Sequence, residues 1–255
     1  MSWERKVHLK NPAEIALMRE AGRINAKALD ATRQLLRPGV STADLNAAAE
    51  EVLKKHGVRS PFKGYGRPPF PASVTISVNE QLVHGIPGKR KLKEGDIVSV
   101  DCGTIFEGYV ADSAYTSGVG EQSPRAADLL KVTEKALYAG IAQMRRGNRT
   151  GDVSAAIQGV VESGGYHVTR VYTGHGVGRE MHEGPEVPNY GVPGRGLELS
   201  PGMVIALEPM VIVGTPETHV LADQWTVVSA DGSLTAHFEH SVAVTEGEPL
   251  ILTVP

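Results

Sequence analysis

The stretch LKEGDIVSVD, residues 92–101, decides the fold because its pattern returns later in the chain. Residues 199–208, LSPGMVIALE, repeat the turn, the apolar strand and the terminal acid at an offset of 107. Upstream of each copy, residues 39–57 match residues 147–165 at seven positions with an offset of 108. Internal repeats of this kind predict two similar halves related by a pseudo-twofold axis. Chance likeness between two helix-plus-strand segments is the alternative.

Local signals around the repeat predict the order of helices and strands. Asn11-Pro12 and Ser41 are typical helix starts, because Asn and Ser cap a first turn and Pro fits its first position. Ser123-Pro124 predicts a long helix that Gly147 ends. Further elements are expected at residues 150–163 (helix) and at 74–78, 96–102 and 108–115 (strands). We therefore predict an α+β fold in one domain, with helix–helix–β halves at about 10–120 and 121–250 around a central antiparallel sheet.

Composition excludes several classes of protein. With 255 residues, 41% of them hydrophobic, and a formal net charge of −3, the chain can build a sizeable core and has no charge excess typical of nucleic-acid binders. The single cysteine, Cys102, excludes an internal disulfide and a cysteine-based zinc cluster. Residues 1–6 contain no apolar run, so no signal peptide is expected. Since no stretch approaches the about 20 apolar residues of a membrane span, we expect a soluble, cytoplasmic protein.

Two acids occupy equivalent repeat positions, Asp101 and Glu208, each at the end of an apolar strand where a bare carboxylate is costly. Asp112 follows the first and Glu239 the second. A hairpin turn at 106–107 would place Asp101 opposite Asp112, a turn at 107–108 would place them diagonally on one face, and an odd-length loop would separate them. One buried acid is most often a core carboxylate or half of a salt bridge. Four at repeat-related positions favour a divalent metal pair.

Three histidines lie in glycine-flanked turns, namely His84, His175 and His182. The glycines around His175 let the backbone pass close to a neighbour, and no helix pattern follows them, so they are not a dinucleotide fingerprint. We interpret the other histidines as structural: His8, His56, His167, His219, His237 and His240. Four carboxylates with one histidine are typical of a two-metal site for Mn²⁺, Fe²⁺, Co²⁺ or Zn²⁺ that hydrolyses an amide or ester.

On these motifs the chain resembles the type 1 methionine aminopeptidases, whose pita-bread fold is shared with proline aminopeptidases and creatinase. The resemblance spans about residues 10–245 and rests on the stretches 77–80, 83–87, 100–101, 111–112, 174–178, 181–183, 207–209, 225–227 and 238–240. It implies hydrolytic removal of the initiator methionine from nascent proteins whose second residue is small. No Cys-rich N-terminal extension and no large inserted subdomain are present, which indicates the bacterial form.

The resemblance also implies a role for each candidate residue. The expected metal ligands are Asp101, Asp112, His175, Glu208 and Glu239, with Asp112 and Glu239 bridging two ions. A hydroxide bridging the ions would attack the scissile carbonyl. Glu208 would move the proton of the attacking water, His84 would face the scissile nitrogen, and His182 would stabilise the oxyanion.

The methionine side chain of the substrate is expected in a pocket lined by Tyr65, Phe70, Thr75 and Trp225. Such a pocket accepts a flexible thioether by dispersion and sulfur–aromatic contact. Thr75 stands where the family often has Cys, and Met181 where Phe is common. Two extra residues near Pro68-Pro69 shift the alignment of Tyr65. These departures bear on the shape of the pocket and not on the reaction.

Partners and rival functions complete the expectations. We expect a monomer that acts on the N-terminal Met of nascent chains, with no specific nucleic acid and no membrane. The basic residues Lys89, Arg90, Lys91 and Lys93 are candidates for ribosome contact, although such a cluster is more often a solvated turn. A proline-specific aminopeptidase of the same fold is one alternative, but such enzymes usually carry an extra N-terminal domain. A non-catalytic pita-bread binding module is another, and it should show substituted ligands.

Overall fold

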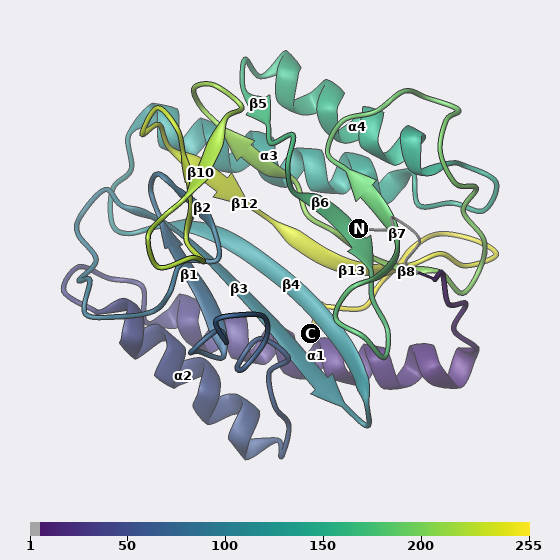
Figure 1. Ribbon diagram of the computed structural model, residues 1–255, viewed down its shortest axis with the longest axis horizontal. Coiled ribbons are helices and arrows are strands. Elements are labelled where there is room, and N and C mark those ends of the chain that lie inside the picture. The colour runs from purple at the N-terminus through teal and green to yellow at the C-terminus, as the bar shows by residue number, and fades with distance from the viewer. Residues whose placement is uncertain (1–5) are drawn as a thin grey trace.

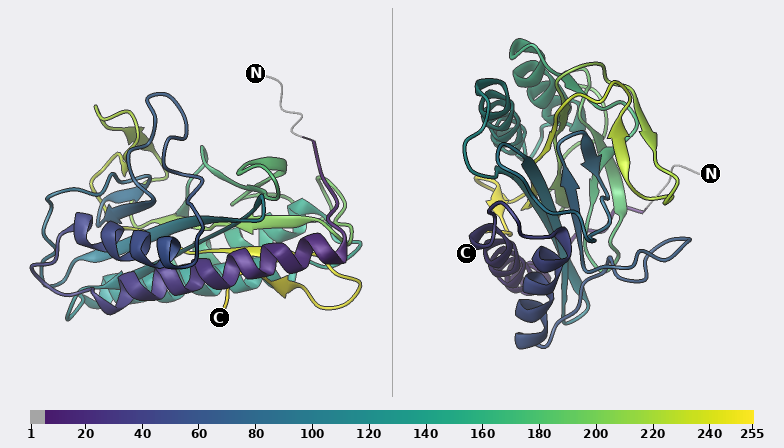
Figure 2. Two further views of the ribbon diagram at one scale, coloured as in Figure 1. Left: turned by 90° about the horizontal axis from the view of Figure 1, so that it is seen from below. Right: turned by 90° about the vertical axis from the view of Figure 1, so that its left-hand side faces the viewer.

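Four helices pack as one layer against a curved sheet in this computed structural model, which describes residues 6–255 (Figures 1 and 2). Most of the segment that carries the signal-peptide prediction therefore lies outside the described residues. The helices are α1 (Pro12–Gln34), α2 (Thr42–Lys55), α3 (Pro124–Ala142) and α4 (Thr150–Ser163). They cover one face of the sheet, which leaves the other face to loops and to the candidate site (Figure 2).

The predicted helix starts are confirmed, with the expected caps. The Asn11 side chain accepts from the amide of Glu14 at 3.0 Å, and Glu14 accepts from the amide of Asn11 at 2.9 Å. Ser41 and Asp44 form the same reciprocal box at the start of α2. Because α2 and α4 begin and end at positions 108 apart, the repeat seen in the sequence is also a repeat of structure.

The helix α3 ends earlier than Gly147 predicts, at Ala142. The residues that follow leave the helix because other groups take their backbone partners. The side chain of Asn148 donates to the Gln143 carbonyl at 2.9 Å, and the amide of Gly147 donates to Leu199 at 3.1 Å. This segment therefore joins the turn before β8 instead of continuing the helix.

The main sheet has the order β1-β3-β4-β13-β8-β6-β7, with β14 also pairing with β13, and its pairs are antiparallel. Its strands are β1 (Val74–Val78), β3 (Ile97–Phe106), β4 (Tyr109–Gly118), β6 (Thr173–Gly176), β7 (Glu183–Pro188), β8 (Val204–Leu207), β13 (Glu239–Ala243) and β14 (Leu250–Ile251). The first half of the chain supplies one side of the sheet and the second half the other. They meet at the β4–β13 pair in the centre (Figure 1).

Two smaller sheets flank this centre. One has the order β10-β11-β2, and the other has the order β12-β9-β5. Their strands are β2 (Gln81–Val83), β5 (His167–Val168), β9 (Met210–Ile212), β10 (Thr218–Val220), β11 (Val227–Ser229) and β12 (Thr235–His237). The β11–β2 pair brings Trp225 and His84, which adjoin these strands, to one edge of the site. None of the described helices combines the length and apolar character needed to span a membrane.

The β3–β4 hairpin settles the register that the sequence left open. Phe106 pairs with Tyr109, so the turn is Glu107-Gly108, and both turn residues have positive φ (48° and 79°), as a type I′ hairpin turn requires. Asp101 pairs with Ala114, and Asp112 with Gly103. The two aspartates therefore lie diagonally on the same face of the sheet.

Candidate active site

Strand register brings three acids to one face at the centre of the sheet. Ala114 of β4 pairs with Asp101 of β3 on one side and with Glu239 of β13 on the other. Asp101 and Glu239 therefore lie in one row across the three strands, with Ala114 between them. Asp112 lies two residues from Ala114 on β4 and shares its face. A Ser241 hydroxyl fixes this junction, because it accepts from the Asp112 amide at 2.9 Å and donates to the Asp112 carbonyl at 2.8 Å.

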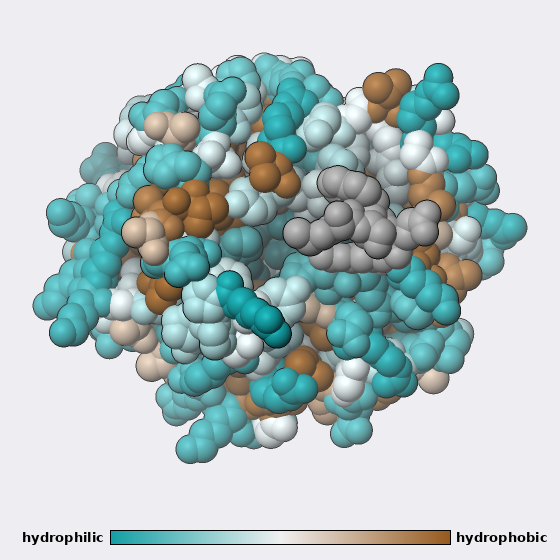
Figure 3. Space-filling model, viewed as in Figure 1, coloured by the Kyte–Doolittle hydropathy of each residue, from teal (hydrophilic) through white to brown (hydrophobic). Residues whose placement is uncertain are grey.

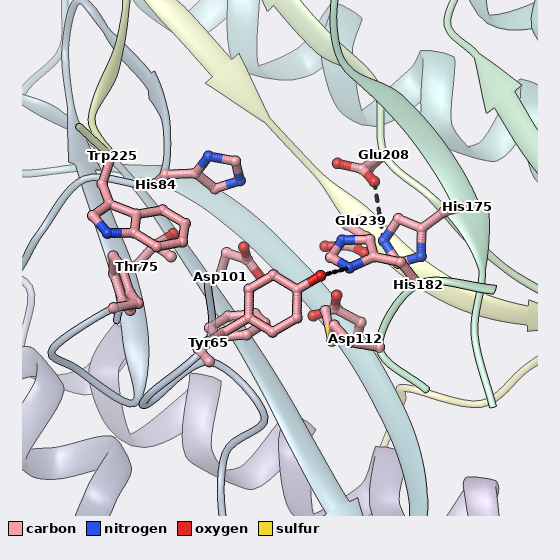
Figure 4. Close-up of a pocket in the computed structure, with 13 residues that line it drawn as sticks. Tyr65, Thr75, His84, Asp101, Asp112, His175, His182, Glu208, Trp225 and Glu239 are labelled. Atoms are coloured by element: carbon pink, nitrogen blue, oxygen red, sulfur yellow. Dashed lines mark hydrogen bonds and ion pairs between the residues drawn. The ribbon is translucent and has the colours of Figure 1, made fainter. Parts of the chain in front are cut away.

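The second half of the chain adds His175 and Glu208 to the same face. His175 pairs with Ala206, and Glu208 lies two residues beyond Ala206, just past the end of β8. His175 Nδ1 lies 3.0 Å from the carbonyl of Gly176, and since a carbonyl only accepts, Nδ1 carries the hydrogen. His175 Nε2 then points to Glu208, 3.4 Å from Oε1 (Figure 4).

Glycines around His175 are required by close packing of the backbone. A Cβ on Gly174 would lie 2.6 Å from the Ala206 carbonyl oxygen, and one on Gly176 would lie 2.0 Å from the Gly184 carbonyl oxygen. The backbone that passes close to His175 is therefore that of its own sheet neighbours. Close packing of the backbone therefore explains the glycine-rich motif, and no bound phosphate or nucleotide is needed to explain it.

Burial of these acids without a counter-charge perturbs all of them. Burial raises the pKa of Asp101 to about 7, while its hydrogen bonds with Asp112 and Thr75 act in the opposite direction. Burial also raises the pKa of Asp112, Glu208 and Glu239 well above the usual range, and the neighbouring carboxylates add to the effect. Clustered carboxylates of this kind mark functional sites more often than ordinary core positions.

The donor set fits a divalent cation. Asp101 Oδ1, Asp112 Oδ1 and Glu239 Oε1 are buried and have no hydrogen-bond partner among the described residues. Ligand atoms of Asp112, His175 and Glu239 all lie within 4.8 Å of one another. A divalent ion at this point would satisfy the unpaired oxygens and favour the ionised carboxylates.

One pocket contains every residue that the sequence analysis singled out for ligation, catalysis or substrate binding. In the space-filling view this face of the molecule is hollowed near its centre (Figure 3). The pocket walls include, from the predictions, Tyr65, Phe70, Thr75, His84, Asp101, Asp112, His175, His182, Glu208, Trp225 and Glu239. The acids form its floor, and aromatic rings form one side (Figure 4). Ligation itself stays a prediction, because it depends on an ion.

The two catalytic histidine candidates flank the acids. His84 has positive φ (60°), a strained conformation for a residue other than glycine that is typical of functional positions. Burial lowers the pKa of His84 to about 4, so the ring is neutral at physiological pH. His182 packs beside His175 with ring centroids 4.3 Å apart, and its Nδ1 lies 2.8 Å from the Tyr65 hydroxyl. Tyr65 thus contacts a catalytic candidate as well as lining the pocket.

The aromatic side of the pocket is built around Trp225. Phe70 meets the indole edge-on, with ring centroids 5.2 Å apart, and the indole N–H donates to the Pro68 carbonyl at 3.1 Å. Gly66 has φ of +74°, and a Cβ there would lie 2.5 Å from the indole. The extra residues near Pro68-Pro69 therefore hold Trp225 in place.

Two residues of the site escape the sequence analysis. Phe62 lines the pocket, but no local signal distinguishes it from a core residue. His237, interpreted as structural, is buried with Nε2 at 3.7 Å from Glu208 Oε2 and 3.8 Å from Glu239 Oε2. Burial, and secondarily the nearby His84, lowers the pKa of His237 to about 3. No local pattern distinguishes His237, because its burial follows from the pairing of β12 with β9.

Comparison with known proteins identifies the family. The sequence model of metallopeptidase family M24 matches residues 16–246 of this chain. The chain belongs to metallopeptidase family M24. M24 membership and the buried cluster together support the use of a divalent metal.

Two of the similar proteins are bacterial and match this chain over nearly their full length. A methionine aminopeptidase of Clostridium acetobutylicum is 52% identical over 247 residues, covering 96% of this chain and 98% of its own. The crystal structure of a methionine aminopeptidase from Thermotoga maritima superposes with a TM-score of 0.95 at 45% identity, covering 98% of this chain and all of its own. These matches confirm the pita-bread fold and the resemblance inferred from the motifs.

Another solved structure shows how far the fold extends. A prolidase from Pyrococcus horikoshii superposes with a TM-score of 0.77 at 21% identity. The match covers 96% of this chain but 63% of the prolidase. This similarity shows the fold alone.

Proposed function

We propose that this M24 metallopeptidase is a methionine aminopeptidase, which hydrolyses the bond after the N-terminal methionine of nascent proteins. The observation that carries the proposal is one pocket that joins an acid cluster to an aromatic side wall. The names and full-length similarity of the relatives support it. The proline-specific and non-catalytic alternatives are not favoured, because the predicted ligand positions converge and the high-identity relatives are methionine aminopeptidases.

Two divalent ions are proposed, held by Asp101, Asp112, His175, Glu208 and Glu239. When bound, such ions lower the pKa of water and polarise a carbonyl. The structure supports this ligand set through the shared face, the unpaired oxygens and the raised pKa values of the carboxylates. Mn²⁺, Fe²⁺, Co²⁺ and Zn²⁺ all suit an oxygen-rich site of this kind.

The side chains around the acids would divide the remaining tasks. Glu208 lies at the edge of the cluster and would accept a proton from the attacking water. His182 would donate to the substrate carbonyl oxygen as it gains charge. His84, across the pocket, would contact the scissile nitrogen (Figure 4). Together these groups bind and orient the peptide end and move its protons.

The methionine side chain would bind beside Phe70 and Trp225. Met181 and Phe62 complete this apolar side of the pocket. Aromatic edges and a flexible thioether pack well against a linear sulfur-containing chain. Thr75 pairs with Asp101 across β1 and β3, so Thr75 ties the pocket to the ligand set.

Several finer points belong to the proposal. We propose action in the cytoplasm, as a monomer, on proteins whose second residue is small. Lys89, Arg90, Lys91 and Lys93 are all exposed, as a ribosome contact requires. Arg90 also lies 3.7 Å from Glu80, which is compatible with a solvated turn.

The test is peptide cleavage by chelator-stripped enzyme with Mn²⁺, Fe²⁺ or Co²⁺ added back. We expect release of Met from a Met-Ala-Ser peptide, and none from Asp112→Asn under the same conditions. Release from an Ala-Pro peptide instead would favour the proline-specific alternative. No release with any metal would overturn the proposal and favour a binding module.

A further inference from the structure

His237 is a buried group that the proposed reaction leaves without a task. It ends β12, and its side chain is 3% exposed. Its Nε2 has no hydrogen-bond partner among the described residues. A buried polar atom without a partner costs about 1–3 kcal/mol, so its retention in the core calls for a reason.

The unpaired nitrogen faces two carboxylates at once. Nε2 lies 3.7 Å from Oε2 of Glu208 and 3.8 Å from Oε2 of Glu239. Both distances exceed a hydrogen bond. The second oxygens of the two glutamates lie elsewhere, since Glu208 Oε1 is 3.4 Å from His175 and Glu239 Oε1 is unpaired. His237 Nε2 therefore lies between one carboxylate oxygen of Glu208 and one of Glu239.

The backbone, and not the ring, fixes this position. The Thr116 hydroxyl donates to the His237 carbonyl at 2.7 Å and accepts from the His237 amide at 2.9 Å. On the other side His237 pairs with Met210 of β9. Since these contacts would hold any residue at position 237, they do not explain why an imidazole occupies it.

We propose that His237 is a positioning residue whose Nε2–H is shared between Oε2 of Glu208 and Oε2 of Glu239, and that these contacts shorten to hydrogen bonds when the carboxylates hold their metal ions. This inference rests on the proposed metal site. A carboxylate oxygen that binds a metal keeps a further lone pair, and a hydrogen-bond donor at that lone pair fixes the orientation of the carboxylate. His237 thus holds one general-base candidate and one bridging candidate from the same side.

The test compares His237→Leu with His237→Gln in the full-length, metal-free chain. Calorimetric titration with Mn²⁺ should show binding about 10- to 100-fold weaker in His237→Leu. His237→Gln, whose amide can donate to a carboxylate, should recover most of the affinity. In turnover assays His237→Leu should lower kcat with little change in KM, and His237→Gln should again restore it.

Thermal unfolding without metal separates this role from a structural one. We expect the melting temperature of metal-free His237→Leu to equal or exceed that of the natural chain, because the variant removes an unpaired buried nitrogen. The matched control is His240→Leu, since His240 Nδ1 is 2.8 Å from the Thr253 hydroxyl. That variant should melt lower without metal and bind Mn²⁺ with unchanged affinity.

The Mn²⁺ titration distinguishes a positioning role of His237 from direct ligation and from the absence of a metal site. Equal Mn²⁺ affinity in the natural chain and His237→Leu would overturn the role of His237 alone. Failure of the natural chain to bind Mn²⁺ would overturn the metal site itself. Loss of one bound ion per chain in both His237 variants would instead make His237 a direct ligand, which also contradicts the proposal.

Discussion

The two halves of the chain place their acids in different ways. Asp101 and Asp112 lie inside the long, regular ladder of the β3–β4 hairpin. Glu208 follows the last residue of β8, and Glu239 is the first residue of β13. A regular strand fixes a short side chain through its backbone alone. At strand ends the longer glutamates reach the same centre, and neighbouring histidines, His175 and His237, lie against their oxygens.

The connections between strands also differ between the two halves, in what holds each of them in place. The first half closes its hairpin with two residues of positive φ, Glu107 and Gly108. The second half carries His182 in a longer segment between β6 and β7, anchored by a buried ion pair of 2.6 Å between Lys10 and Glu183. Glu183 also accepts from the amide of Arg179 at 2.8 Å. Backbone conformation suffices in the first half, whereas side-chain contacts are needed in the second.

The largest expected effect comes from breaking that ion pair. Lys10→Met leaves the buried carboxylate of Glu183 without its partner, which should lower the free energy of unfolding by about 3–5 kcal/mol. Urea denaturation measures it. Lys63→Met is the control, since the exposed Lys63–Glu50 pair should contribute less than about 1 kcal/mol. Similar losses in both variants would show that the second-half segment does not depend on this pair.

Exchanging side-chain length between the halves tests the comparison directly. Glu208→Asp should keep the fold but lose about 100-fold in kcat, because the carboxylate is withdrawn by a bond length from a strand end. Asp101→Glu should instead lower stability by about 1–3 kcal/mol, because an extra methylene overfills a buried site. Steady-state kinetics measure kcat and urea denaturation measures the free energy of unfolding for both variants. A stable Asp101→Glu with normal activity would contradict the proposed rigidity of the first half.

The pH dependence of the metal-free chain probes the acids of both halves together. Folding raises the pKa of Asp101 from 3.8 to about 7, so between these values the folded chain holds a proton that the unfolded chain has released. Stability therefore falls as pH rises through this window. We expect the melting temperature to drop by roughly 5 °C between pH 5 and 7.5. Saturating Mn²⁺ should abolish the drop, and a drop that persists would argue against metal at these acids.

The smallest effect concerns the hairpin turn. Gly108→Ala should cost about 1 kcal/mol, because φ is +79° and alanine is strained there. Gly159→Ala in α4 is the opposite case, since no atom lies within 4 Å of a Cβ and φ is ordinary. That variant should gain about 0.5–1 kcal/mol. Equal effects of the two substitutions would mean that the turn does not fix the hairpin.

Local signals in the sequence were sufficient where the determining contact is local. Capping residues predicted the helix starts, and the repeat predicted equivalent strands. The diagonal register of Asp101 and Asp112 follows from the turn at Glu107-Gly108. The sequence indicated this turn as one of several possible positions but did not select it. The early end of α3 and the burial of His237 depend on pairing with distant strands, through Leu199 and Met210 respectively. No local pattern carries that information.

The Ser241 hydroxyl that bridges β4 and β13 has a kinetic consequence. It joins Asp112 to a residue 129 positions away, so the centre of the sheet forms by long-range closure, which is slow compared with forming a hairpin or a helix. The Asp101–Asp112 pair and the Glu208–Glu239 pair come from different halves, so no complete ligand set exists until that closure happens. Metal uptake during refolding should therefore time the final docking step, and its rate should follow substitutions at Ser241 more closely than those in the β3–β4 turn.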